Sequence, residues 1–444
     1  MRCLRPIVGA ATAIIVAVSC SSSPGRRGVL LITLDAVRAD HLSCYGYHLK
    51  TTPFIDELAT QGVRFDQAIA VSSNTPVTHA SLLTGLYPAR HGLRFIHGYQ
   101  AHQLGSGIVT IARVFSKAGF KTAAFVSAFP LTARRSGLQS GFDVYDDDII
   151  RNETSAISPD GKVRIKENQR SGDETISHFL DWLTREKPRR FFAWVHLFDA
   201  HDLNIKPPEE FMREFEKKAA IRYPNEPVRH RHYDSEIAYI DLLLRRMREK
   251  MKPVIPWEDL QVVIVSDHGD GLGDHGYERH TSRIYQEQIR VPLIISGPGL
   301  PRGMRISSEV STVDVAPTLL AINNLLPPVR VDGRSLLPMM QGSAPSRACY
   351  AEALSAMLEN QPPLFAVVKD GKKLIYAPTE QRFELYDLRK DPAELANLAS
   401  DVAHAGLRDA LFKELQNYPL TIDLKPGDAL TAEDTEKLRA LGYL

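Results

Sequence analysis

The chain has 444 residues, with 54 Lys and Arg against 53 Asp and Glu, and 43% of its residues are hydrophobic. This composition is typical of a globular protein, and the length is sufficient for one large domain and a smaller one. Near-neutral charge offers no clustered basic face of the kind that nucleic-acid binding requires, so no nucleic-acid partner is expected.

The N-terminus has the pattern of a targeting segment. Arg2 and Arg5 precede the apolar run "PIVGAATAIIVAVSC", whose length suits the core of a signal peptide better than a membrane span. Small residues directly before Cys20 are similar to a bacterial lipoprotein cleavage site, at which Cys20 is lipidated. We therefore assign residues 1–19 to a signal peptide and 20–28 to a tether, and expect a lipid-anchored protein of the cell envelope, on the periplasmic face or the outer membrane. The alternative is cleavage nearby and secretion.

Predicted strands and helices alternate along most of the chain. A continuous apolar strand over residues 29–34 is of the kind buried on both faces of a parallel sheet. A helix follows over residues 52–62, and another runs from the Thr-Pro turn at Thr75 to Gly85. Further helix-then-strand pairs are predicted over 108–119 and 121–128, 173–186 and 190–198, and 234–251 and 260–267. The alternation predicts an α/β fold with a mostly parallel sheet flanked by helices.

The C-terminal part has a different pattern. After the apolar stretch 289–299 and a helical stretch 311–323, two apolar stretches flank Asp370-Gly371, which indicates a hairpin. We predict a catalytic domain over residues 29–344 and a small C-terminal α+β subdomain with an antiparallel sheet over 345–444. Cys44 and Cys349 are predicted to be buried free thiols, with a disulfide between them as the alternative.

Polar side chains follow several predicted strands, where ligands bind in open α/β sheets. They are Asp35, Thr75, His196, Asp199, His201, Asp267 and His268, with His275 and His280 a little further on. Each alone has a structural explanation, such as Thr75 capping its helix. Together, two carboxylates, an imidazole and a hydroxyl form a plausible shell for one divalent cation, with Zn²⁺ or Mn²⁺ favoured and Ca²⁺ open. Such a cation would lower the pKa of the Thr75 hydroxyl.

The chain resembles the sulfatase family of the alkaline phosphatase superfamily. The resemblance rests on segments that follow one another in the family's order: "LITLDAVRADHLSCYGY", "TPVTHASLLTGLYPARHG", "HLFDAHDL", "VIVSDHGDGLGDHG", "YQEQIRVPLIISGPG", "VSTVDVAPTLLAI", "DGRSLLPMM" and "ELYDLRKDPAELANLA". It implies an alkaline-phosphatase-like fold and a metal-dependent hydrolase of sulfuric or phosphoric esters. It also places Thr75 at the nucleophile and Asp35, Thr75, Asp267 and His268 around the metal.

The sequence departs from the family at the centre of that site. Sulfatases carry a Cys or Ser that is oxidised to formylglycine, whereas the β-carbon of Thr75 bears a methyl group, so no formylglycine is expected. His79 replaces the family's Arg, Ala36 replaces the second of two opening Asp residues, and His268 stands where many sulfatases have Asn. These departures resemble the phosphodiesterases, phosphonate hydrolases and phosphoglycerol transferases of the superfamily.

The resemblance implies further roles for the histidines. His201 or His280 would protonate the leaving oxygen. His196 lies in the segment that faces the leaving group, and His79 either contacts a substrate oxygen or only packs. A second metal, held by residues from His196, Asp199, His201, His275 and His280, stays open, with one metal favoured.

Four functions remain open at this stage. The favoured one is hydrolysis of phosphodiesters or phosphonates, and hydrolysis of sulfate esters is second. The others are transfer of a phosphoglycerol- or phosphoethanolamine-type group, for which residues 151–172 and 207–227 would wall an acceptor groove, and an inactive sulfatase-like binding protein. The expected partners are a small-molecule, lipid-headgroup or glycan ester, and the membrane through the lipid anchor.

Overall fold

A computed structural model describes residues 27–94, 103–149, 156–157, 163–164, 169–201, 206–222, 227–327, 330–342 and 346–422. The predicted signal peptide, the lipidation site Cys20, most of the tether and most of the segment 151–172 lie outside these ranges. Within them, every helix is too short or too polar to cross a membrane.

The centre of the fold is an eight-stranded sheet with the order β10-β2-β9-β8-β1-β7-β3-β4. Its strands are β1 (Arg27–Leu34), β2 (Gly62–Ile69), β3 (Lys121–Phe125), β4 (Val144–Asp146), β7 (Arg190–Leu197), β8 (Leu260–Ser266), β9 (Arg290–Ser296) and β10 (Met304–Ser311). Neighbouring strands are parallel except at β9, which is antiparallel to β8 and to β2. The predicted α/β class with a mostly parallel sheet is confirmed.

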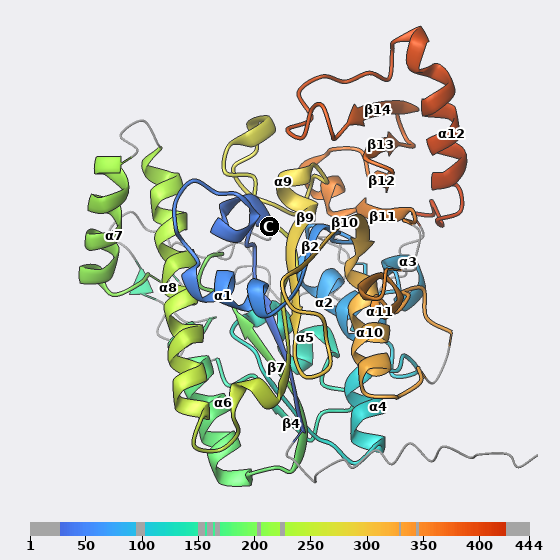
Figure 1. Ribbon diagram of the computed structural model, residues 1–444. Helices are drawn as coiled ribbons and strands as arrows, with labels where there is room; N and C mark the ends of the chain where they lie inside the picture. Colours follow the sequence, from blue (N-terminus) through green and yellow to red (C-terminus); the bar gives the residue numbers. More distant parts are fainter. Residues whose placement is uncertain are drawn as a thin grey trace, which may run out of the picture.

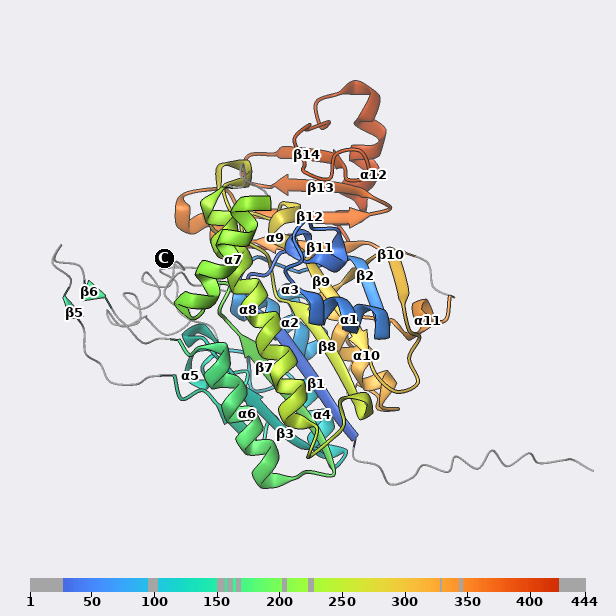
Figure 2. The same cartoon turned by 60° about the vertical axis from the view of Figure 1, so that its left-hand side comes forward.

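Helices cover both faces of this sheet (Figures 1 and 2). On one face lie α1 (Pro53–Gln61), α6 (Gly172–Glu186) and α8 (Val228–Met251), which share a core with Leu30 and Ile32 of β1. On the other lie α2 (Thr75–Thr84), α4 (Ile111–Lys117) and α10 (Val315–Ile322), whose core includes Val29 and Leu31. Successive side chains of a strand point to opposite faces, so the apolar run of β1 serves both cores.

Other helices are α7 (Glu209–Arg222) and the four-residue α3 (Pro88–His91), α5 (Ala133–Ser136), α9 (Gln286–Ile289) and α11 (Leu337–Met340). A separate two-stranded sheet consists of β5 (Ala156–Ile157) and β6 (Val163–Arg164). Cys44 and Cys349 are free thiols, as predicted, but only Cys349 is buried; Cys44 is half-buried.

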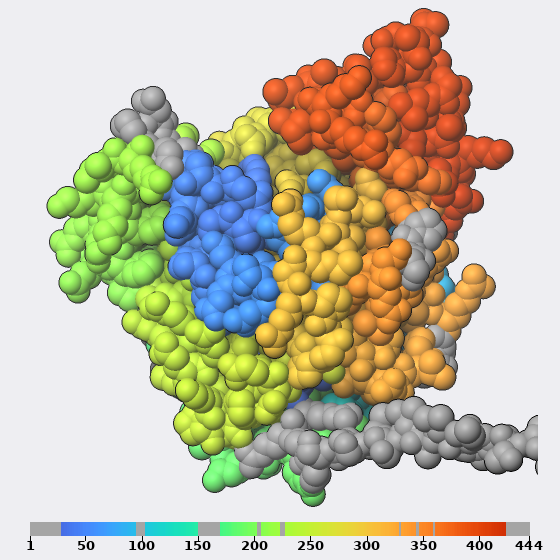
Figure 3. All heavy atoms as spheres, viewed as in Figure 1, coloured from blue at the N-terminus to red at the C-terminus, as the bar shows by residue number. Residues whose placement is uncertain are grey.

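A second, smaller sheet lies in the C-terminal part (Figure 1), which protrudes from the main body (Figure 3). It is antiparallel, with β11 (Cys349–Ala353), β12 (Leu364–Lys369), β13 (Lys372–Ala377) and β14 (Arg382–Asp387), and α12 (Ala405–Leu415) packs against it. Asp370 and Gly371 both adopt positive φ, at 52° and 74°, as a tight two-residue hairpin turn requires. The predicted antiparallel sheet is therefore confirmed, while the domain boundary at residue 345 stays a prediction.

Candidate active site

The fold brings four of the predicted site residues to one point at the carboxyl edge of the sheet. Asp35 follows β1, and Asp267 and His268 follow β8. These two strands are neighbours in register, with Leu34 opposite Ser266, so the residues that follow them emerge side by side. Thr75 is the first residue of α2, and all four side chains are fully buried.

The donor atoms of this group are close enough to share one cation. Ligand atoms of Asp35, Asp267 and His268 lie within 4.8 Å of one another, and Nε2 of His268 is 3.3 Å from Oδ2 of Asp267. The Thr75 hydroxyl lies 3.1 Å from the same Nε2 and 3.5 Å from Oδ1 of Asp35. Two carboxylates and an imidazole suit Zn²⁺ or Mn²⁺. The residues present therefore fit a divalent metal ion.

Hydrogen bonds behind these side chains fix the atoms that face the cluster. His268 donates its Nδ1–H to the Gly269 carbonyl at 2.8 Å, so its Nε2 carries the lone pair and faces the Thr75 hydroxyl. His196 accepts the Ser127 N–H at Nδ1, at 3.2 Å, so its Nε2–H donates to Oδ2 of Asp35 at 2.9 Å. Asp35 is thereby turned so that Oδ1 faces Thr75 and His268. Both ring nitrogens of His196 therefore have protein partners. Its predicted contact with substrate is not tested and stays a prediction.

Burial makes the metal-free cluster electrostatically unfavourable. It raises the pKa of Asp35 well above its usual value, and burial together with the charge of Asp35 does the same for Asp267. Burial, followed by the neighbouring His280, lowers the pKa of His268 well below its ordinary value. A cation bound between these side chains would stabilise the ionised carboxylates and the neutral imidazole, and so offset the cost of burying them.

His280 and His201 continue this row of imidazoles. The His280 ring stacks on His268 with centroids 4.2 Å apart. Its Nδ1–H donates to the Ser73 carbonyl at 3.0 Å, and its Nε2 accepts the Nε2–H of His201 at 2.8 Å. Burial lowers the pKa of His280 to about 4 and lowers that of His201 as well. Both rings are neutral near pH 7 in the absence of an anion, and a bound anion would raise their pKa values.

His79 has the contacts of a packed side chain. Its Nδ1–H donates to the Thr75 carbonyl at 2.8 Å, and its Nε2 accepts the hydroxyl of Thr33 at 3.0 Å. Thr33 in turn accepts the Nε1–H of Trp194 at 2.9 Å. Of the two roles left open by the sequence, this closed chain of hydrogen bonds favours packing, with His79 holding the first turn of α2 that carries Thr75.

The residues considered for a second metal do not form a ligand group. Asp199 accepts the N–H of Gly172 at 3.0 Å, while His275 is held by Glu287 at 3.0 Å and by the Glu394 carbonyl at 3.2 Å. Within the residues that the structure describes, Asp35, Asp267 and His268 are the one group of three or more side chains with metal-site spacing. This geometry favours a single metal.

Comparison with known families agrees with this geometry. The family model for sulfatases matches residues 27–324, two thirds of the chain. The chain belongs to the sulfatase family. A second model, for the C-terminal part of N-sulphoglucosamine sulphohydrolase, matches residues 273–420. The protein is thus a sulfatase-family hydrolase of sulfuric or phosphoric esters, and the family is metal-dependent.

Relatives with similar sequences cover most of the chain. An arylsulfatase of Clostridium perfringens is 25% identical over 461 residues, covering 87% of this chain and 94% of the relative. An ulvan-active sulfatase of Formosa agariphila is 24% identical, with coverages of 88% and 81%.

Solved structures show the same fold. Phosphonate monoester hydrolase of Agrobacterium radiobacter superposes with a TM-score of 0.68 at 23% identity, over 88% of this chain and 95% of that one. Ps i-CgsB, solved in complex with k-i-k-neocarrahexaose, gives 0.71 at 18% identity, over 94% and 97%.

One residue that the sequence did not single out, Tyr233, fixes the turn between Asp35 and Arg38 in this sulfatase site. Tyr233, from α8, donates its hydroxyl to the Ala36 carbonyl at 2.7 Å and accepts the Arg38 N–H at 2.8 Å. Ala36 has φ of 56°, an unfavourable value for a residue with a side chain, and its N–H donates to Asp267 at 3.2 Å. No local pattern reveals this role, because Tyr233 lies about 200 residues from the turn that it holds.

Replacing Tyr233 by Phe is expected to loosen this turn. The variant keeps the ring but loses both hydrogen bonds, so unfolding should require about 1–3 kcal/mol less free energy. Metal affinity should fall about tenfold, because the turn orients Asp35. Denaturant melts and metal titrations would measure both. Tyr239→Phe, on the same helix but in ring contact with Phe211, is the matched control. Unchanged metal affinity in Tyr233→Phe would argue against the orienting role.

Proposed function

We propose that this protein hydrolyses phosphodiester or phosphonate esters with Thr75 as its nucleophile and one divalent cation. The observation that carries the proposal is the position of the Thr75 hydroxyl, buried against His268 and Asp35. Capping does not explain that position, because the N-cap residue of α2 is Asn74 and no side-chain cap bond forms.

The chain's own groups suit each part of this reaction. A cation held by Asp35, Asp267 and His268 would supply the positive charge that lowers the pKa of the Thr75 hydroxyl. The Thr75 hydroxyl would lose its proton to solvent, and its Oγ1 then forms a bond to phosphorus while the ester P–O bond breaks. The leaving oxygen takes a proton from His201 or His280, whose pKa values rise when an anion binds beside them. The intermediate is a phosphodiester or phosphonate ester of Thr75. Water then forms a bond to phosphorus and gives one proton to the neutral imidazole, while the bond from phosphorus to Thr75 Oγ1 breaks.

The side chain at position 75 favours phosphorus over sulfur. The formylglycine hydrate carries a second hydroxyl on the same carbon, and that hydroxyl expels sulfate without attack at sulfur. Thr75 has a methyl group there, so its ester must be opened by water at the central atom, a route that phosphoryl esters follow readily. Sulfate esters stay the second candidate because the sequence relatives described above are sulfatases.

The proposed location is the cell envelope, with the chain anchored through a lipid on Cys20. Its support is the N-terminal sequence, in which small residues precede that cysteine. In this setting the substrates to consider are esters of lipid headgroups and envelope glycans, and transfer to an acceptor alcohol is the alternative to hydrolysis.

A substrate panel tests the proposal. The mature chain would be assayed with Zn²⁺, Mn²⁺ or Ca²⁺ on aryl phosphodiester, phosphonate, phosphomonoester and sulfate substrates, with and without glycerol as an acceptor. We expect metal-dependent turnover of the diester and the phosphonate. Dominant sulfate turnover would contradict the proposal. Phosphoglycerol formed at the expense of hydrolysis would identify a transferase, and no turnover of any substrate would favour the binding protein.

A further inference from the structure

The C-terminal part holds a buried ion pair that the proposed reaction does not use. Lys373 of β13 and Glu394, in the loop that follows β14, have side chains that are 0% exposed, and Nζ of Lys373 lies 2.8 Å from Oε1 of Glu394. Burial raises the pKa of Glu394, and the Lys373 ammonium opposes that rise. Because apolar side chains of similar volume often replace a buried ion pair without loss of stability, this pair needs another explanation.

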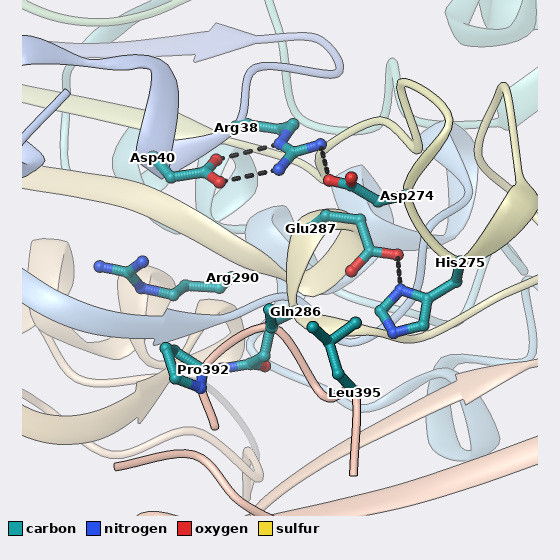
Figure 4. A pocket seen from close by; sticks show the side chains of 10 residues that line it. Arg38, Asp40, Asp274, His275, Gln286, Glu287, Arg290, Pro392 and Leu395 are labelled. Atoms are coloured by element: carbon teal, nitrogen blue, oxygen red, sulfur yellow. Dashed lines mark hydrogen bonds and ion pairs between the residues drawn. The ribbon is translucent and has the colours of Figure 1, made fainter. Parts of the chain in front are cut away.

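Glu394 joins the C-terminal part to the main body at two points. Its Oε2 accepts the N–H of Gln286 at 2.5 Å, and its backbone carbonyl accepts the Nε2–H of His275 at 3.2 Å. Pro392 and Leu395, on either side of Glu394 in the chain, line one cavity with His275 and Gln286 (Figure 4). Glu394 itself has φ of 53°, which is unfavourable for a residue with a side chain, so the contacts on both sides must hold this loop.

The two contacts lie at the two ends of the segment 275–286, which carries His280. The ring of His275 stacks on the ring of Tyr285 with centroids 3.9 Å apart, so the ends of the segment meet. The ammonium of Lys373 lies 5.9 Å from the centre of the same Tyr285 ring. The segment is therefore a closed loop, and its base rests on the buried ion pair.

His280 lies in the middle of this loop and depends on it for its position. Its ring stacks on that of His268 with 4.2 Å between centroids, and its Nδ1–H donates to the Ser73 carbonyl. The next residue, Thr281, has φ of 88°, which is rare for a β-branched side chain. Such a conformation costs free energy and persists only where the surrounding structure holds it. A loop released at its base would relax here and carry His280 with it.

We propose that Glu394, held by Lys373, is a positioning residue for His280. It fixes the base of the loop 275–286 and so keeps His280, hydrogen-bonded to His201, where a proton can pass to the leaving oxygen. The inference rests on the proposed function, in which His201 or His280 protonates that oxygen, and it gives the C-terminal part a role in the same step.

Leaving groups of different basicity test the positioning. Methylphosphonate esters of 4-nitrophenol and of phenol would be compared, because 4-nitrophenolate departs without a proton whereas the more basic phenolate needs one. Glu394→Gln keeps the shape of the side chain, but its one carboxamide oxygen can face Lys373 or the Gln286 N–H and not both. The ratio of kcat/KM for the phenyl ester to that for the 4-nitrophenyl ester should fall about tenfold in this variant. An unchanged ratio would overturn the proposal.

Two further variants test the contact with Gln286. Lys373→Met/Glu394→Gln lets the carboxamide oxygen turn to the Gln286 N–H, so the ratio should recover most of the loss. Glu394→Asp keeps the charge beside Lys373 but is one methylene shorter and withdraws from Gln286, so the ratio should fall, and this variant is the test if Glu394→Gln does not fold. Absence of recovery in the double variant, or a normal ratio in Glu394→Asp, would also overturn the proposal.

Glu352→Gln is the matched control. Glu352 of β11 also forms a buried ion pair that joins the C-terminal part to the main body, with Arg94 at 2.6 Å, but it lies outside the loop 275–286. The variant should lower the melting temperature and leave the ratio of the two rates unchanged. A fall in the ratio as large as in Glu394→Gln would show an effect of stability alone and contradict the positioning role.

His280→Asn separates this inference from the proposed function. It should lower the ratio at least as much as Glu394→Gln does. If it did so while Glu394→Gln left the ratio unchanged, only the positioning by Glu394 would be wrong. If His280→Asn itself left the ratio unchanged, His280 would not protonate the leaving oxygen, and the positioning role would fail with it. Absence of metal-dependent turnover of both esters by the wild type would instead refute the proposed function.

Discussion

Replacing Thr75 by alanine is expected to lower kcat by a factor on the order of 10⁴ or more, while the protein stays folded and binds metal. The reason is that an alanine side chain cannot form the covalent phosphoryl ester, so water must attack the substrate directly. Steady-state rates on an aryl phosphodiester would measure the loss. The fold should persist because Asn74, and not Thr75, is the N-cap of α2.

Two matched variants separate chemistry from packing. Thr75→Ser keeps the hydroxyl and should retain much of the activity. Thr84→Ala removes a buried hydroxyl from the other end of the same helix, where it donates to the Ala80 carbonyl at 2.6 Å. It should lower stability by about 1 kcal/mol and leave kcat nearly unchanged. Quenching the wild type during turnover should place a phosphoryl adduct on the peptide that contains Thr75. If Thr75→Ala kept more than a tenth of the wild-type activity, Thr75 could not be the nucleophile.

The sequence predicted the centre of the site because of strand topology. Asp35 and Asp267 each follow an apolar run, and parallel strands end at the same edge of a sheet. The neighbouring register of β1 and β8 then brings the two carboxylates together. Thr75 was found from the same logic, with the family resemblance supplying its role.

The orientation of the side chains was beyond sequence reasoning. The ring nitrogens of His196 and His79 have protein partners in Ser127, Asp35, Thr33 and the Thr75 carbonyl. These partners are distant in sequence or are backbone atoms, and neither leaves a periodic pattern. The sequence also provided no direction for β9, for a related reason. An apolar run predicts a buried strand, but its direction depends on which neighbours it pairs with.

The second large effect concerns the metal. Removing it with a chelator should abolish turnover, and Zn²⁺ or Mn²⁺ should restore it. Asp267→Asn should weaken metal binding by roughly a hundredfold or more, because the variant removes one carboxylate from the donor set. Asn at this position still fits, since Oδ1 can accept the N–H groups of Ala36 and His268, which lie at 3.2 and 2.8 Å. Its amide can donate to Nε2 of His268.

Although Asp267→Asn should weaken metal binding, it should stabilise the metal-free protein against unfolding. Without a cation, two buried carboxylates repel each other, so Asp267→Asn should raise the free energy of unfolding by about 1–3 kcal/mol at pH 8. Asp241→Asn is the matched control, because the Asp241 carboxylate is also buried but accepts the N–H groups of Phe54 and Ile55 on separate oxygens. An amide cannot accept both, so that variant should be less stable and bind metal normally.

The pH dependence of stability gives the sharpest test of this argument. The folded-state pKa values of Asp35 and Asp267 are raised above the unfolded value of 3.8. Between pH 3.8 and the raised folded-state pKa values, these two carboxyl groups hold more protons in the folded state than in the unfolded chain. Their contribution to the stability of the metal-free protein therefore falls as the pH rises above about 4. Bound metal keeps both carboxylates ionised in the folded state, as they already are in the unfolded chain above about pH 5, so this slope disappears. Melts from pH 5 to 8, with chelator or with Zn²⁺, should therefore diverge, and Asp267→Asn should remove most of the difference. Parallel curves for the wild type would show that no cation binds between these carboxylates.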